Sequence, residues 1–210
     1  AHEIRNPLFA IGGFAKKLWE DPSLDEQRRE RAGIILEEAR RLEDLCKNLL
    51  SFARPTKQDV LSVDVNAVAK QTVSVMQIGS SERRIKVGLE LSDNPPKVYG
   101  NPELIQQCLV NLIKNAMEAL CDGGTIRVRT RFAESMVYLE VEDDGPGIPV
   151  ELQEEIFSPF FSTKEEGSGL GLALTRKIVN ECDGKLFLHS RPGSPTVVSL
   201  ALQPVLAGGD

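Results

Sequence analysis

Residues 136–149, MVYLEVEDDGPGIP, join a strand pattern to an acidic, glycine-rich turn. Apolar and polar residues alternate over 136–142, and a similar alternation over 125–132 precedes it, so the two runs predict a β-hairpin. The glycines after Asp143 permit unusual backbone dihedrals and let the main chain approach a ligand closely. At the strand end, the Asp143 carboxylate is able to accept a hydrogen bond from the exocyclic amine of adenine. Taken alone, the turn is equally typical of any acidic loop.

Regular elements are predicted on both sides of this hairpin. Strand alternation recurs at 85–91, Lys185–His189 and Thr196–Leu202, and helices are expected over 65–79, 102–120 and from Gly171 to about Cys182. Strands in mixed order with about three helices predict an α/β sandwich whose helices cover one face of the sheet.

The first part of the chain is predicted to be a helical hairpin. Apolar residues recur at steps of three and four from Ile4 to Leu18, and Ile35, Leu42 and Leu49 repeat at heptad spacing. Arg54-Pro55 ends the second helix because proline cannot continue it. A lone hairpin cannot bury both faces of its apolar seam, so we expect two copies to pair into a dimeric four-helix bundle. The fold class is thus α+β, with a hairpin domain over 1–57 and a second domain over 58–210.

Composition excludes several classes of protein and site. The net charge of −6 over 210 residues argues against non-specific nucleic-acid binding, which needs a basic surface. Four scattered cysteines without a C-x-x-C pair, and only two histidines, make a structural zinc site unexpected and favour free thiols in a reducing, cytoplasmic compartment. No apolar run has the length of a membrane span. Because the chain begins within a helical pattern at Ala1-His2, we expect it to be a fragment, with any membrane segment lying outside it.

A histidine and a glutamate open the chain in the motif His2-Glu3-Ile4-Arg5-Asn6-Pro7-Leu8. Helical spacing places His2 and Asn6 one turn apart on the face opposite the apolar seam. Glu3 is able to accept the Nδ1 proton of His2 and leave Nε2 free to attack an electrophile. Pro7 is expected to bend the helix at this point. The alternative is a surface histidine beside a surface glutamate, and this motif alone does not decide between the two.

Two asparagines, Asn111 and Asn115, are spaced i and i+4 on the predicted long helix. Amide oxygens suit Mg²⁺, which also retains waters and phosphate oxygens as ligands. Lys114 lies between them and could reach a phosphate, although a solvated lysine is the alternative. Two asparagines alone would more often be surface amides, so the pair gains meaning only from the other motifs along the chain.

A third cluster combines aromatic residues with glycines ahead of a helix. Residues 157–164 read FSPFFSTK, and residues 167–172 read GSGLGL. Glycines before a helix N-terminus form a cradle of backbone N–H groups for phosphate. The pattern differs from a Walker loop because no Gly-Lys-Ser/Thr follows it, and it lacks the context of a dinucleotide fingerprint. The aromatic residues favour a mobile lid. As isolated features, aromatic residues more often belong to a core and glycines to an ordinary loop. His189, at a strand end, has no expected role.

The order of these motifs resembles that of the sensor histidine kinases of two-component systems over essentially the whole chain. The resemblance implies a dimerisation and phosphotransfer hairpin followed by an ATP-binding domain of the Bergerat type, with ATP and Mg²⁺ as cofactors. It further implies autophosphorylation of His2 and transfer of the phosphoryl group to an aspartate of a response-regulator receiver domain. The Arg54-Pro55 ending and the Phe-Phe-Ser-Thr-Lys lid are similar to those of the nitrogen-regulation branch.

The resemblance also implies roles for individual residues. His2 is the phosphoacceptor, Glu3 is its base, and Asn6 orients the water that dephosphorylates the aspartate of the regulator. Asn115 and Asn111 are the expected Mg²⁺ ligands, and Asp143 reads adenine. The remaining nucleotide contacts are expected at Lys114, Gly145, Gly147, Ile148, Thr163, Lys164, Gly167, Ser168, Gly169, Leu170, Gly171 and Leu172. Ser168 stands where threonine is common, and Met117-Glu118-Ala119 replaces a lysine and a tyrosine of some relatives.

Two other functions share some of these features. The nucleotide fold is similar to that of gyrase, mismatch-repair and heat-shock-chaperone ATPases, which hydrolyse ATP with a glutamate one turn before the magnesium asparagine. Asn111 occupies that position here, and an amide cannot take a proton from water. The third possibility is a scaffold dimer without chemistry, which the full set of nucleotide-site residues disfavours.

Overall fold

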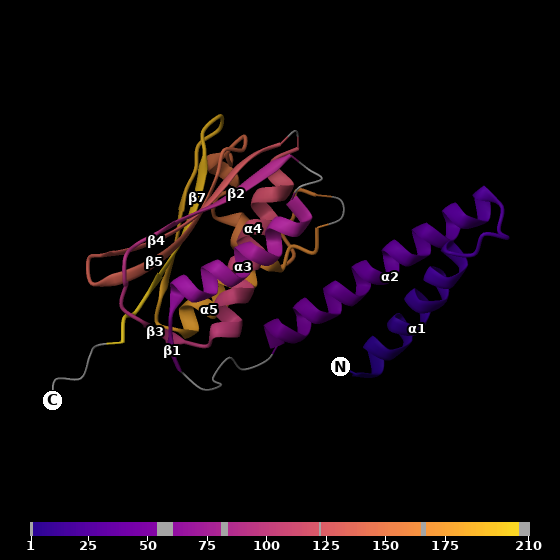
Figure 1. Cartoon of the computed structure of the whole chain (residues 1–210), viewed down its shortest axis with the longest axis horizontal. Helices are drawn as coiled ribbons and strands as arrows, with labels where there is room; N and C mark the ends of the chain where they lie inside the picture. Colours follow the sequence, from indigo (N-terminus) through magenta and orange to yellow (C-terminus); the bar gives the residue numbers. More distant parts are fainter. Residues whose placement is uncertain (1, 54–60, 81–83, 122, 165–166, 206–210) are drawn as a thin grey trace. The chain divides into compact units, whose positions relative to one another are not determined.

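The computed structural model describes residues 2–53, 61–80, 84–121, 123–164 and 167–205, with only the backbone for 2–5, 44, 47–48, 51–53 and 78–80. The chain divides into two compact units, whose elements are labelled in Figure 1. The first unit comprises Ala1–Arg54 with Ser162–Leu170, and the second comprises Pro55–Phe161 with Gly171–Asp210. The domain boundary predicted at residues 57 and 58 lies outside the described residues.

Helices α1 (His2–Trp19) and α2 (Glu26–Ala53) form a hairpin in the first unit (Figure 1). The connection between them is held by Asp21, whose carboxylate accepts hydrogen bonds from the backbone N–H and the hydroxyl of Ser23. Asp25 then caps α2 by accepting the N–H of Arg28 at 2.8 Å, which satisfies one of the backbone donors left unpaired at a helix start.

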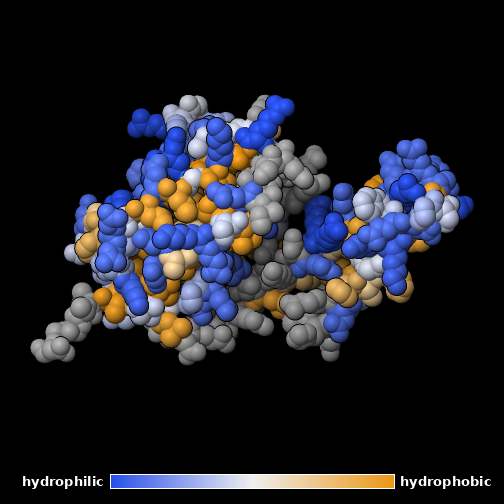
Figure 2. Space-filling view, in the orientation of Figure 1, coloured by the Kyte–Doolittle hydropathy of each residue, from blue (hydrophilic) through white to orange (hydrophobic). Residues whose placement is uncertain are grey.

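The two helices of the hairpin meet through small side chains. Ala15 of α1 is buried, as are Ala32 and Ala39 of α2. The heptad residues of α2 lie elsewhere: Ile35 is 49% exposed and Leu42 is 43% exposed. Figure 2 shows scattered apolar side chains, in shades of orange, among hydrophilic ones on the visible side of the hairpin. The heptad therefore forms an outer stripe that the hairpin alone leaves uncovered.

The second unit contains a five-stranded sheet in the order β2-β4-β5-β7-β6. Its strands are β2 (Ile85–Leu91), β4 (Gly124–Ala133), β5 (Met136–Asp143), β6 (Lys185–His189) and β7 (Thr196–Leu202). β2 and β4 are parallel, and the other neighbouring pairs are antiparallel. Helices α3 (Val65–Ser80), α4 (Pro102–Ala119) and α5 (Gly171–Glu181) cover one face of the sheet (Figure 1). The predicted α/β sandwich is therefore confirmed.

The hydrophobic core lies between the helices and the sheet face that they cover. Ile126 of β4 and Leu139 of β5 are fully buried there, as the period of two in each strand predicts. α4 contributes Ile105, Leu109 and Ile113, which recur at helical spacing and are also fully buried. This packing fixes α4 against β4 and against β5, the strand that ends at Asp143.

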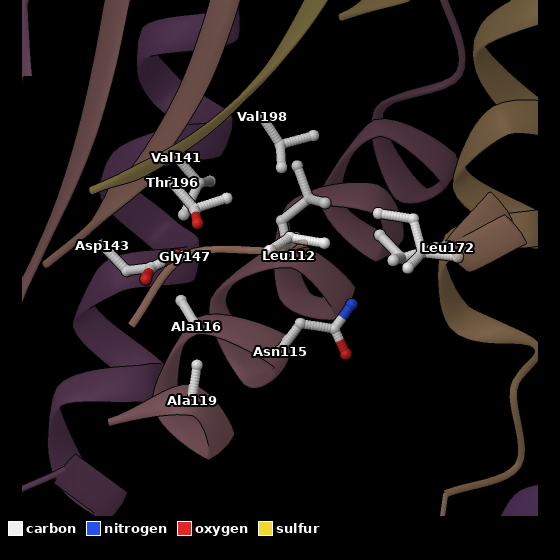
Figure 3. Close-up of a pocket in the computed structure, with 12 residues that line it drawn as sticks. Leu112, Asn115, Ala116, Ala119, Val141, Asp143, Gly147, Leu172, Thr196 and Val198 are labelled. Carbon is white, nitrogen blue, oxygen red and sulfur yellow. The ribbon is translucent and has the colours of Figure 1, made fainter. Parts of the chain in front are cut away.

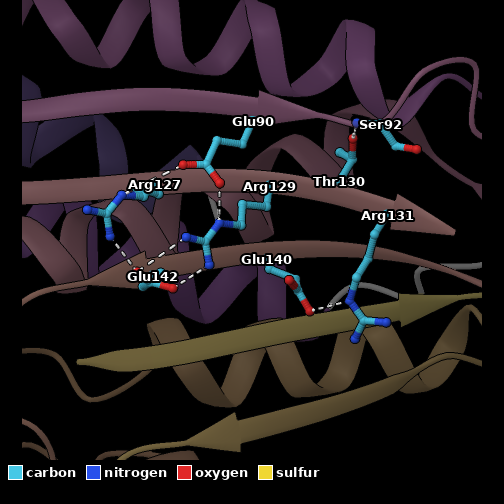
Figure 4. A network of polar contacts seen from close by, with 8 residues as sticks. All are labelled: Glu90, Ser92, Arg127, Arg129, Thr130, Arg131, Glu140 and Glu142. Carbon is cyan, nitrogen blue, oxygen red and sulfur yellow. Dashed lines mark hydrogen bonds and ion pairs between the residues drawn. The ribbon is translucent and has the colours of Figure 1, made fainter. Parts of the chain in front are cut away.

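The opposite face of the sheet carries a network of ion pairs (Figure 4). Glu142 of β5 lies between Arg127, at 2.6 Å, and Arg129 of β4. Arg129 also contacts Glu90 of β2 at 2.6 Å. Because opposite charges alternate across three strands, the network favours the observed register of their pairing.

The sequence does not predict the two-stranded sheet of β1 (Leu61–Val63) and β3 (Val98–Gly100). Three residues are too few to display an alternating pattern. β3 also contacts the segment after β7, because the N–H of Tyr99 donates to the carbonyl of Gln203 at 3.1 Å.

The cysteine thiols form no disulfide. Burial raises the pKa of the Cys108 thiol, which keeps it protonated and unreactive at neutral pH. Within the described ranges, no group of three or more His, Cys, Asp or Glu side chains could hold a metal ion. The helices in this part of the chain are all too short or too polar to cross a membrane.

Candidate functional site

A pocket opens between α4 and the strands β5 and β7 (Figure 3). The cavity has a volume of about 80 Å³ and is open to solvent on one side. Most of the lining is apolar, and Asn115, Asp143 and Thr196 supply the polar side chains. The complete lining is Leu112, Asn115, Ala116, Ala119, Val141, Asp143, Gly147, Ile148, Ile156, Leu172, Thr196 and Val198.

The polar groups occupy separate parts of the pocket. Figure 3 shows the carboxylate of Asp143 at one side and the amide of Asn115 at another, with Ala116 between them in this view. A ligand with a flat apolar portion would contact the aliphatic walls and reach one polar group with each end. Of the residues predicted from the sequence, the pocket brings together Asn115, Asp143, Gly147, Ile148 and Leu172.

Asp143 is the buried acceptor of the pocket. Only 7% of the residue is exposed, and its Oδ1 accepts the N–H of Gly145 at 3.0 Å. Burial raises the pKa of Asp143, and the nearby charges of Asp144 and Glu142 raise it further, whereas the Gly145 N–H opposes the shift. A ligand that donates a hydrogen bond to the other carboxylate oxygen would therefore stabilise the ionised form of Asp143.

Thr196 is a site residue that the sequence motifs do not identify. It is the direct cross-strand partner of Asp143 in the β5–β7 register, and it is buried. Its hydroxyl lies 2.7 Å from that of Ser190, and Ser190 also accepts the N–H of Ile148 at 2.8 Å. Only the pairing of two strands far apart in the sequence brings these groups together, so no local pattern reveals them.

Gly147 fixes the acidic turn against the loop between β6 and β7. Its φ of 77° is in the left-handed region, and a Cβ at this position would lie 1.9 Å from the carbonyl oxygen of Arg191. The Pro146 carbonyl accepts the N–H of Gly193 at 2.7 Å, and the Gln153 amide donates to the carbonyls of Ile148 and Ser190. The need for glycine at position 147 therefore comes from the close packing of this turn against the backbone of the β6–β7 loop.

The paired asparagines of α4 have different surroundings. Asn115 lines the pocket, and its amide oxygen is a suitable ligand for Mg²⁺, which commonly takes one or two protein ligands and completes its shell with phosphate and water. Asn111 is not among the lining residues, and its Nδ2 donates to the carbonyl of Gly171 at 3.2 Å. Lys114 is exposed and is also absent from the lining.

The glycine-rich segment and the residues before it form hydrogen bonds with one another. Ser162 Oγ accepts the N–H of Lys164 at 3.1 Å, and the N–H of Gly167 donates to the Lys164 carbonyl at 3.3 Å. The N–H of Leu170 donates to Ser168 Oγ at 3.4 Å. The segment Ser162–Leu170 belongs to the first unit, so the phosphate contacts expected of Thr163, Lys164, Gly167, Ser168, Gly169 and Leu170 stay predictions.

The motif at the start of the chain lies in α1. The helix begins at His2 and continues through Pro7. The side chains of His2 and Glu3 lie outside the described residues, so their predicted contact stays a prediction. Asn6, one turn after His2, is exposed. His189 is also exposed, at the end of β6.

Two family models match the chain. Residues 100–205 match the model described as "Histidine kinase-, DNA gyrase B-, and HSP90-like ATPase". Residues 1–58 match the "His Kinase A (phospho-acceptor) domain". The two matches cover the pocket and the hairpin, respectively.

Curated relatives match nearly the whole chain. The signal transduction histidine-protein kinase AtoS of Escherichia coli (strain K12) is 35% identical over 203 residues, which are 96% of this chain and 33% of the relative. The sensor histidine kinase ZraS of the same strain is 33% identical over 202 residues, 96% of this chain and 43% of the relative. The chain thus spans less than half the length of these two proteins.

Solved structures share the architecture. ThkA in complex with the response regulator protein TrrA has a TM-score of 0.74 and 30% identity, covering 97% of this chain and 59% of that one. Full-length ShkA in complex with AMPPNP has a TM-score of 0.82 and 24% identity, covering 99% of this chain and 45% of that one.

Proposed function

Because this chain belongs to the sensor histidine kinases, we propose that it binds Mg-ATP and transfers the γ-phosphoryl group to His2. The phosphoryl group then passes to an aspartate of a response regulator. The observation that carries the proposal is the pocket in which a buried carboxylate, Asp143, and an amide, Asn115, lie at separate places along an apolar wall. This arrangement suits a molecule with an aromatic base at one end and phosphates at the other.

The adenine base is assigned to the Asp143 side of the pocket. An exocyclic amine donates a hydrogen bond to the buried carboxylate, which has an acceptor available but no donor while it is ionised. Guanine would place a carbonyl oxygen where adenine has its amine, and two acceptors would then face each other without a proton. Thr196, beside Asp143 in the strand register, offers a hydroxyl to a ring nitrogen or to a water.

The triphosphate is assigned to the Asn115 side. Asn115 would hold Mg²⁺ through its amide oxygen, and the metal would supply neutralisation of phosphate charge. Leu172 lies in the first turn of α5 and lines the same pocket, so the helix start, whose backbone N–H groups favour anions, is close to this end. Lys164 and the glycines of 167–171 would add further donors.

His2 and Glu3 carry the transfer step in the proposed mechanism. Glu3 accepts the Nδ1 proton, which leaves the lone pair of Nε2 directed at the γ-phosphorus. The new N–P bond forms as the bond to the bridging oxygen of ADP breaks, and positioning supplies most of the rate. Asn111 has no carboxylate with which to activate water, so transfer to His2 is favoured over hydrolysis.

The partners follow from the hairpin. A second copy of this chain would cover the apolar stripe of Ile35, Leu42 and Leu49, which gives a homodimer. The response regulator would dock on the exposed face that contains Asn6, and Asn6 would orient the water that dephosphorylates it. The free thiols support a cytoplasmic location for this catalytic portion.

The test of the proposed function is labelling with ATP carrying a radioactive γ-phosphate. The wild-type protein should acquire an acid-labile, base-stable phosphate, and His2→Gln should acquire none. His189→Gln is the matched control, because it makes the same substitution at an exposed strand-end residue, and it should label like the wild type.

Three results would contradict the proposal. Label that persists in His2→Gln would reject His2 as the acceptor. Steady release of free phosphate that does not depend on His2 would identify an ATPase. Calorimetry that detects no ATP binding would favour a scaffold protein.

A further inference from the structure

The start of α5 is tied to α4 by a side-chain hydrogen bond. Asn111 Nδ2 donates to the carbonyl oxygen of Gly171, the first residue of α5, at 3.2 Å. A carbonyl oxygen only accepts hydrogen bonds, so the amide nitrogen of Asn111 is the group that must face it. The same carbonyl accepts the hydroxyl of Thr175 at 3.0 Å, and Thr175 is fully buried.

The contact between the two helices at this point is close. A Cβ built on Gly171 would lie 3.7 Å from Asn111 Cγ, so the backbone of α5 rests directly on the Asn111 amide. Asn115 lies one helical turn further along α4, and Leu172 directly follows Gly171; both line the pocket. The hydrogen bond therefore links the start of α5 to the same helix that carries Asn115.

We propose that Asn111 is a positioning residue that holds the N-terminal end of α5 in place for the phosphates of the nucleotide. The inference deepens the proposed function and rests on it, and it gives Asn111 a task other than the Mg²⁺ coordination expected from the sequence. Helix N-termini bind anions through backbone N–H groups whose direction is fixed by the helix axis. A helix start that moves loses part of this interaction, because the electrostatic attraction depends on distance and alignment.

The positioning role predicts a specific pattern of binding in Asn111→Ala, which removes the donor without adding charge. ATP affinity should fall about tenfold, the scale of one lost hydrogen bond, and should fall equally with Mg²⁺ and in EDTA. Asn180→Ala is the matched control, because Asn180 is exposed on the same α5 helix. Calorimetry on wild type and both variants, with and without Mg²⁺, measures these affinities, and the control should bind like the wild type.

Metal coordination by Asn111 predicts a different result. In that case Asn111→Ala would lose affinity only in the presence of Mg²⁺, and Asn111→Asp, which supplies a stronger ligand for the metal, would restore it. Either this result or an unchanged affinity in Asn111→Ala would overturn the positioning role.

A second measurement does not depend on nucleotide. Amide hydrogen exchange of the ligand-free protein should become faster at residues 171–175 in Asn111→Ala and stay unchanged in Asn180→Ala, because the start of α5 opens more readily without its tether. Unchanged exchange in Asn111→Ala would reject the positioning role of Asn111 without contradicting the proposed function. A wild-type protein that binds no ATP would instead reject the proposed function, so the two failures are distinguishable.

Discussion

At the scale of single residues, the burial of Asp143 makes nucleotide binding depend on pH. Burial raises the pKa of this carboxyl, so it takes up a proton on acidification before ordinary exposed carboxyls do. The protonated group no longer offers an ionised acceptor to adenine. We expect ATP affinity in the wild type to decrease on acidification, measured by calorimetry over a pH series. Asp143→Asn should bind about 10- to 100-fold more weakly at neutral pH, as expected for a lost hydrogen bond to a charged group, and without this pH dependence.

Ionisation of Asp143 favours nucleotide binding but is expected to lower the stability of the ligand-free fold. A group whose folded-state pKa is raised stabilises the fold below its unfolded pKa, and this stabilisation is lost as the pH rises through the folded value. Ionised Asp143 therefore destabilises the ligand-free protein at neutral pH. Asp143→Asn should raise the midpoint of thermal unfolding there, and the difference should disappear at low pH. An equal or lower midpoint at neutral pH would contradict the burial argument.

The positions of pocket residues are predictable from the sequence where these residues lie close together along the chain. Asp143 and Gly147 lie within one turn, so a strand followed by acidic and glycine residues indicates both. Thr196 and Ser190 reach the pocket or its supporting loop only through the β5–β7 register, which a sequence does not display. Asn111 was recognisable as half of an i, i+4 pair, but its contact with Gly171 depends on how two helices pack.

At the scale of elements, periodicity predicts the long helices and strands and fails for short ones. β6 and β7 have the bounds that their alternation predicts, whereas β1 and β3, at three residues each, show no pattern. In the hairpin, the heptad of α2 indicates a helix but does not show which side of that helix packs against α1. Ala32 and Ala39 take the inner positions because small side chains let the helices approach, and Ile35 and Leu42 remain outside.

Phe9 of α1 is a large apolar residue that lies outside the apolar seam predicted from Ile4 to Leu18. Phe9 is 74% exposed, and it follows His2 and Asn6 at steps of seven and three along the same helix face. A large exposed aromatic residue on the helix face of the proposed phosphoacceptor is suited to anchor the protein that would receive the phosphoryl group. Phe9→Ala should slow phosphotransfer to the regulator by about tenfold or more and leave autophosphorylation unchanged.

Phe14→Ala is the matched control for this prediction. Phe14 is 68% exposed, but five residues further along α1 it points to a different side of the helix. The measurement is the rate at which prephosphorylated protein loses label to a receiver domain. Equal slowing by the two substitutions would show that Phe9 has no special role in docking.

At the scale of the whole molecule, the proposed acceptor and the nucleotide pocket belong to different compact units. His2 lies in α1 of the first unit, and Asn115 and Asp143 lie in the second. Phosphoryl transfer requires these groups to meet at bonding distance. The division into units therefore favours a mechanism in which movement of one unit against the other controls the reaction.

The exposed stripe of α2 predicts the oligomeric state. Burying one large aliphatic side chain contributes about 1.5–3 kcal/mol, and a symmetric pair of hairpins buries Ile35 and Leu42 from each copy. The double substitution Ile35→Gln and Leu42→Gln should therefore weaken dimerisation by roughly a thousandfold or more. The chain mass is 23.1 kDa, so light scattering at micromolar concentration should report about twice this mass for the wild type and the monomer mass for the variant.

Glu37→Gln with Arg40→Gln places the same residue type at exposed positions outside the stripe, and this control should remain dimeric. A wild-type monomer, or a stripe variant that stays dimeric while circular dichroism shows intact helices, would mean that the stripe has another partner.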